Sequence, residues 1–288
     1  MRSLIFLGVA LLAGSSAHAQ PARPEGAGVV DTPQRQAQAL DRDGKGAEAR
    51  VIWQRLIDNA ADPKTKSEAQ RRMAMSYGFE HNCAGAVKYE EMVIAYWVTR
   101  EKEEPQNAFY QQGEMANEAA RVCIDSGDLA TAEKMYLRGA ELGNREPEPR
   151  THPKSLWDYR TAHARARLNA RGGNKAEALK QVARARQILD SDTAMARAQE
   201  RFYPYLVGYV ALYADDLKTA EAEFTRGLAI RANQDDPFQN YLLALTYEKT
   251  GQSAKARELY QKAYDLSTGH NPPAAFTRAA ARRKIAAP

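Results

Sequence analysis

The stretch SGDLATAEKMYLRGAEL, Ser126–Leu142, begins with a turn signal and continues with the spacing of a helix. Its apolar and small residues recur every three or four positions, as Leu129, Ala132, Tyr136, Gly139 and Ala140. That spacing places them on one face of a helix, and Gly127-Asp128 can turn the chain before it. The preceding segment GEMANEAARVCID, Gly113–Asp125, has a second such face. Together the two segments predict a helical hairpin.

The same hairpin pattern recurs along the chain. It is an alanine followed four residues later by a bulky residue and, after three more, by a small or apolar one. The alanines are Ala49, Ala132, Ala178, Ala220 and Ala256. Ala86 begins a weaker sixth copy, because Glu90 occupies the bulky position. Twelve residues before these six alanines stand the small residues Ala37, Ala74, Ala120, Ala166, Gly208 and Ala244. A turn pair precedes each second helix, so turn chemistry and packing agree on six hairpins.

The last copy, PFQNYLLALTYEKTGQSAKARELYQKAYDL (Pro237–Leu266), resembles the tetratricopeptide repeat family. The family positions are occupied by Leu243, Ala244, Tyr247, Ala256, Tyr260 and Ala263, whereas Asn240 stands where the family has tryptophan. The resemblance covers roughly Pro33 to Asn271. It implies an all-α fold, a right-handed superhelical solenoid of about six hairpins spanning residues 33–271. Residues 272–288 are expected to form a capping helix and tail. A generic alanine-rich helical bundle is the alternative.

The first residues, MRSLIFLGVALLAGSSAHAQ, have the pattern of a secretory signal peptide. A basic start precedes an apolar run from Leu4 to Ala13, and Ala17-His18-Ala19 provides the small residues of a cleavage site. The apolar run is about half of the roughly 20 residues that a membrane-spanning helix needs. The sequence therefore predicts a cleaved signal at residues 1–19 and a flexible segment at 20–32. The mature protein is expected in a bacterial periplasm or outside the cell, without membrane insertion.

The composition and motifs give no sign of catalysis. The 41 basic and 36 acidic residues make a mixed surface, which does not favour nucleic acid as a partner. The sequence contains none of the short patterns typical of phosphate, zinc or nucleophile sites. His81 and Cys83 could supply two metal ligands, fewer than a stable site needs. We therefore expect no enzyme activity, no catalytic residues, no cofactor and no metal.

Cys83 and Cys123 are the only cysteines, separated by about one repeat in a chain expected to be exported. An even pair in that context is a candidate disulfide. Two separate buried thiols are the alternative, because side-chain directions do not follow from the sequence.

A partner surface follows from the resemblance, which implies that the first helix of each hairpin lines a concave groove. The candidate groove residues are Arg71, Arg72, Asn117, Arg121, Arg160, His163, Arg167, Tyr205, Tyr209 and Tyr241. Arginine can hold a carboxylate bidentately, and tyrosine offers a broad contact area with a polar tip. The expected partner is a protein or peptide with an acidic portion or a free terminal carboxylate. The alternative is a solvated basic face and aromatic residues that pack between repeats.

The first functional hypothesis is an exported, non-catalytic scaffold or adaptor, such as one that organises an envelope assembly through its groove. The second is an accessory of cell-wall enzymes, or a glycan-binding protein, in which the tyrosines stack on sugars.

Overall fold

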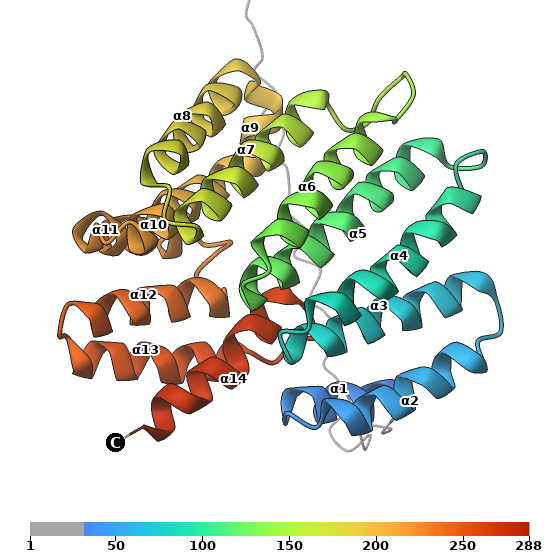
Figure 1. Cartoon of the computed structure of the whole chain (residues 1–288), viewed down its shortest axis with the longest axis horizontal. Coiled ribbons are helices and arrows are strands. Elements are labelled where there is room, and N and C mark those ends of the chain that lie inside the picture. The colour runs from blue at the N-terminus through green and yellow to red at the C-terminus, as the bar shows by residue number, and fades with distance from the viewer. Residues whose placement is uncertain (1–31, 288) are drawn as a thin grey trace, which may run out of the picture. The chain divides into compact units, whose positions relative to one another are not determined.

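The computed structural model describes residues 32–287, and that part of the chain is all-helical, with no strand (Figure 1). The α-helices are α1 (Pro33–Arg42), α2 (Gly46–Asp58), α3 (Pro63–Phe79), α4 (Cys83–Thr99), α5 (Pro105–Ser126), α6 (Leu129–Asn144), α7 (Lys154–Arg171), α8 (Lys175–Ser191), α9 (Thr193–Gln199), α10 (Tyr203–Tyr213), α11 (Leu217–Leu228), α12 (Pro237–Lys249), α13 (Ser253–Leu266) and α14 (Pro272–Ala286). A 3₁₀ turn, η1 (Glu200–Phe202), precedes α10. The expected signal peptide, and all of segment 20–32 except Thr32, lie outside the described residues.

The six predicted helical pairs are present as neighbours in the fold. They are α1–α2, α3–α4, α5–α6, α7–α8, α10–α11 and α12–α13 (Figure 1). The small residues that marked them are all buried at the helix contacts, from Ala37 and Ala49 in the first pair to Ala244 and Ala256 in the last. The pairing is therefore confirmed. The short helix α9 was not predicted.

The six hairpin turns share one backbone geometry. Each has a single residue with positive φ five positions before the anchoring alanine of the second helix: Gly44, His81, Gly127, Gly173, Asp215 and Gly251. Four turns continue with a side chain that accepts a hydrogen bond from a backbone N–H in the first turn of the next helix. These caps are Asn82, Asp128, Asn174 and Asp216. The residue with positive φ reverses the chain, and the capping side chain begins the next helix. These two features explain why the turn pairs in the sequence predicted the hairpins.

Close packing fixes α7 against the α5–α6 pair. Trp157 is fully buried and lies against Gly113 and Gly143. A Cβ atom at these glycines would come within 2.3 Å and 2.0 Å of the indole ring. Only glycine lets α5 and α6 approach Trp157 this closely, and this contact sets the position of the other residues on α7.

The helix α14 contacts the last hairpin, as expected of a cap, and also reaches the first three pairs through α1, α3 and α5 (Figure 1). Just before it, His270 Nε2 lies 2.8 Å from Asp41 Oδ2. Arg72 donates to the His270 carbonyl at 3.0 Å, and Arg278 donates to the Arg42 carbonyl at 2.9 Å. The two ends of the described array are thus joined.

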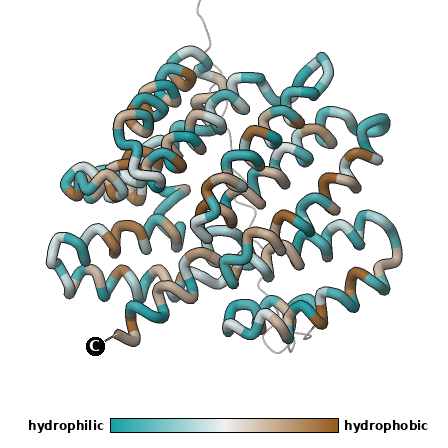
Figure 2. The backbone as a smooth tube through the Cα atoms, in the orientation of Figure 1, coloured by the Kyte–Doolittle hydropathy of each residue, from teal (hydrophilic) through white to brown (hydrophobic). Residues whose placement is uncertain are grey.

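Hydrophobic and hydrophilic residues are mixed along every helix (Figure 2). Within residues 32–287 no helix combines the length and apolar character needed to cross a membrane.

Candidate binding cavity

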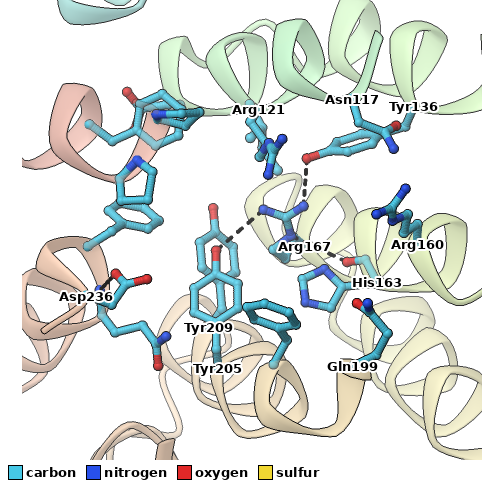
Figure 3. Close-up of a pocket in the computed structure, with 18 of the residues that line it drawn as sticks. Asn117, Arg121, Tyr136, Arg160, His163, Arg167, Gln199, Tyr205, Tyr209 and Asp236 are labelled. Atoms are coloured by element: carbon cyan, nitrogen blue, oxygen red, sulfur yellow. Dashed lines mark hydrogen bonds between the residues drawn. The ribbon is translucent and has the colours of Figure 1, made fainter. Parts of the chain in front are cut away.

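A partly enclosed cavity of about 430 Å³ lies among α5, α6, α7, α10, α12 and the start of α14 (Figure 3). Seven of the predicted groove residues line it: Asn117, Arg121, Arg160, His163, Arg167, Tyr205 and Tyr209. They come from the first helices of three hairpins, α5, α7 and α10, as the groove prediction required.

The other three predicted residues lie elsewhere and have structural contacts. Arg71 forms an ion pair with Glu118 at 2.7 Å. Arg72 holds the carbonyl of His270, as described above. Tyr241 packs against Tyr260 with ring centroids 5.5 Å apart.

Arg167 is the central polar group of the cavity and is only 7% exposed. Its guanidinium donates to the hydroxyl of Tyr136 at 2.6 Å and to that of Tyr205 at 3.4 Å (Figure 3). It also lies within 6.0 Å of the ring centroids of Tyr136, Tyr205 and Tyr209. Burial alone would lower the pKa of this guanidinium, but the three tyrosines raise the pKa overall. Arg167 therefore stays charged.

The charge of Arg167 is not neutralised by a carboxylate. Among the described residues, neither Arg167 nor Arg121 forms an ion pair, whereas Arg160 pairs with Glu114 and stacks 4.7 Å above the Trp157 ring. Taking a cation out of water costs several kcal/mol, and cation–π contacts return only about 1–2 kcal/mol each. Guanidiniums without an ion pair make the cavity favourable for an anion.

His163 lies beside these arginines and is uncharged near neutral pH. Burial, followed by the charges of Arg167 and Arg121, lowers the pKa of its imidazole well below the ordinary value. Its ring stacks on Tyr205 with centroids 5.7 Å apart. A neutral imidazole adds a hydrogen-bonding group to the cavity without adding charge.

Several buried polar atoms around the cavity have no hydrogen-bond partner within the described part of the chain. They are Arg121 Nε, Tyr159 Oη, His163 Nε2 and Gln239 Oε1. Buried polar groups in folded proteins are nearly always paired, so an unpaired group needs an explanation. Their grouping around one cavity points to a polar ligand.

The remaining walls are aromatic and apolar. Phe202, Phe238 and Phe276 line the cavity with Pro272 and Pro273 from the start of α14. Three carboxyl groups also line the cavity: Glu114, which pairs with Arg160; Asp125, which pairs with His81; and Asp236, which caps α12. Burial raises the pKa of Asp236. The cavity thus combines positive charge with ring surface.

Sequence reasoning missed two groups of lining residues. Tyr136 was not among the predicted groove residues, yet its hydroxyl reaches Arg167. The lining residues from α9, η1, α12 and α14 were not predicted either, and those of α14 reach the cavity because α14 also contacts α5. No local pattern in the sequence signals that α14 contacts α5. The position of Tyr136 on the apolar face of its helix did indicate that its side chain is buried.

A disulfide holds the cavity wall on one side. Cys83 of α4 and Cys123 of α5 are bonded, with Cα atoms 4.5 Å apart. Because Arg121 and Asn117 lie on the same helix as Cys123, the bond ties the position of these cavity residues to α4.

Protein-family models and curated proteins were both compared with the chain, and none matches it. The chemistry of the cavity therefore carries the functional argument. Its charged arginines, neutral tyrosines and neutral histidine can bind and orient an acidic group. In residues 32–287 no three histidine, cysteine or acidic side chains group as a metal site.

Proposed function

We propose that this chain is an exported, non-catalytic adaptor that binds an acidic group of a protein or peptide partner in the cavity. In this proposal the hairpins form a tetratricopeptide-like solenoid, and the partner is a component of the bacterial envelope. The observation that carries the proposal is the pair of guanidiniums, Arg121 and Arg167, which line a largely aromatic cavity and form no ion pair within residues 32–287.

The chemistry of the walls favours a peptide end or an acidic side chain. Guanidinium binds carboxylate by two parallel hydrogen bonds, and these charge-assisted bonds are among the strongest in proteins. The tyrosine and phenylalanine rings supply apolar contact area for the residues next to the acidic group. A volume of about 430 Å³ lies within the range of small-ligand sites and is large enough for a terminal residue and its neighbour.

The test uses synthetic hexapeptides labelled with fluorescein at the amino end. Matched sets end in a free carboxylate, end in an amide, or carry an internal glutamate. We expect peptides with an acidic group to bind and fully neutral peptides not to bind, by fluorescence anisotropy. Arg167→Met and Arg121→Met should each weaken binding by about tenfold or more, because each removes charge-assisted hydrogen bonds worth about 1.5–3 kcal/mol.

The matched control is Arg226→Met, which removes an exposed guanidinium on α11 that pairs with Glu223. Its binding should equal that of the wild type. Equal binding by all three variants, or by neutral peptides, would overturn the proposal. Salt-insensitive binding of cell-wall glycan fragments instead of peptides would favour the alternative function, in which the tyrosines stack on sugars.

A further inference from the structure

Glu90 on α4 is a carboxyl group at a position where the other hairpins place a bulky, mostly aromatic side chain. The equivalent residues are Trp53, Tyr136, Val182, Phe224 and Tyr260. Glu90 is only 1% exposed, and both of its carboxyl oxygens lack a hydrogen-bond partner in the part of the chain that the structure describes. A buried, unpaired carboxyl group destabilises a fold, so a purely structural position would favour an apolar residue.

Charged groups on two neighbouring helices act electrostatically on Glu90. Glu118 and Arg121 belong to α5, and Arg71, which forms the ion pair with Glu118, belongs to α3. Burial, and next the charge of Glu118, raises the pKa of Glu90 well above the ordinary value, while Arg71 and then Arg121 lower it. Burial outweighs the two arginines, so Glu90 retains its proton under conditions in which an exposed glutamate has lost it.

Arg121 connects this carboxyl group to the cavity. Its guanidinium lines the cavity, and its charge is one of the two that favour the ionised form of Glu90. The same charge is one of the two that favour an anion in the cavity. The charge of Arg121 therefore favours both ionised Glu90 and a bound anion, and an anion that offsets this charge makes ionisation of Glu90 less favourable.

We infer that binding of an anionic ligand in the cavity is coupled to proton uptake at Glu90, so that the protein holds its ligand more tightly in acid. This inference rests on the proposed function, because it concerns the same cavity and the same class of ligand.

The direction follows from the charges. A bound carboxylate offsets the charge of Arg121, and that loss raises the pKa of Glu90 further in the complex. Between the pKa values of the free and bound states, the complex holds one proton more than the free protein. Affinity must then rise as the pH falls through that interval, by at most about tenfold per pH unit for one coupled proton.

The first experiment measures the coupling directly. The probe is the tightest-binding labelled hexapeptide of the sets described above, titrated by calorimetry in two buffers with different heats of ionisation. We expect net proton uptake by the wild type and an affinity that falls as the pH rises. Glu90→Gln, which mimics the protonated form, should still bind, with a smaller proton uptake and a weaker pH dependence than the wild type, because His163 is the other group in reach of Arg121 that can titrate. Glu91→Gln is the matched control, since Glu91 is half-exposed and pairs with Arg138.

A second experiment needs no ligand. Arg121→Met removes the charge that a bound anion would offset, so the pKa of Glu90 should rise. Carbon-13 NMR of the side-chain carboxyl groups measures this midpoint, with Glu90→Gln identifying the signal. An unchanged midpoint in Arg121→Met, or a pH dependence of binding that is the same in Glu90→Gln as in the wild type, would overturn the inference. If no peptide binds but the midpoint still shifts, the proposed ligand class is wrong while the link between Arg121 and Glu90 stands.

Discussion

Two buried carboxyl groups in this protein, Asp41 and Glu90, have opposite surroundings. Asp41 is 2% exposed and accepts hydrogen bonds from Trp53 Nε1 at 3.0 Å, Ser76 Oγ at 2.5 Å and His270 Nε2 at 2.8 Å. Glu90 is equally buried and accepts none among the described residues. The comparison shows that burial alone does not define the role of an acidic side chain. Three donors make Asp41 an anchor between the chain ends, and their absence leaves Glu90 able to carry a proton.

The largest expected effect comes from removing the anchor. Asp41→Ala leaves three buried donors unpaired, and each unpaired group costs about 1–3 kcal/mol, so we expect the free energy of unfolding to fall by about 3 kcal/mol or more. Urea denaturation followed by circular dichroism measures the loss. The control is Asp43→Ala, an exposed aspartate in the next turn, which should change stability by less than about 0.5 kcal/mol. Equal effects of the two substitutions would contradict the anchoring role of Asp41.

The second prediction has the opposite sign. Glu90→Met replaces an unpaired buried carboxyl group by an apolar side chain of similar length, so the free energy of unfolding at neutral pH should rise by about 1–2 kcal/mol. The same urea titration measures it. Glu118→Met is the comparison, since it leaves Arg71 without its ion-pair partner and should give no gain. A destabilised Glu90→Met would mean that the carboxyl group has a structural partner after all.

The smallest effect is in the pH dependence of stability. The pKa of Glu90 is raised in the native state, so its contribution to stability is lost as the pH rises above the unfolded value of about 4.3. Burial lowers the pKa of His270 despite the nearby Asp41, so that contribution is lost as the pH falls below about 6.5. The free energy of unfolding cannot fall by more than about 1.4 kcal/mol per pH unit in either case. This is the limit when one proton binds to only one of the native and unfolded states.

Melting temperatures measured from mildly acidic to mildly alkaline pH give both slopes. Glu90→Gln should remove only the loss of stability that accompanies a rise in pH. His270→Gln should remove only the loss that accompanies a fall in pH. If either variant changed both slopes, the two sites would be coupled, and their separation into an anchor and a proton carrier would fail.

The local parts of the fold were predictable because their causes are local. Ala132 and the turn at Gly127 identify a hairpin from neighbouring residues alone. The contact between Asp41 and His270 joins residues 229 positions apart, and no periodic pattern marks either residue as a partner. Because the repeat pattern is local, it correctly predicted that Arg121 and Arg167 lie on the first helices of their hairpins. It did not predict the residues that form the opposite wall of the cavity.

The groove residues show a similar limit. Arg72 and Arg167 are both arginines on the first helix of their hairpin, but Arg72 lies two positions before the small packing residue and Arg167 one position after it. One holds a carbonyl of the chain and the other faces the cavity. The contact of Arg72 depends on the meeting of α14 with α3, and that depends on the whole array. Glu90, by contrast, was visible in the sequence as a departure from the repeat.

The contacts of α14 have a consequence for the order of folding. In an open repeat array, each hairpin depends only on its neighbours, and the ends are free to open first. Here Arg278 reaches back 236 residues to Arg42, so the first hairpin cannot complete its contacts until the residues of α14 have been synthesised. Long-range contacts of this kind form slowly. The helix made last among those described thus completes the packing of the one made first.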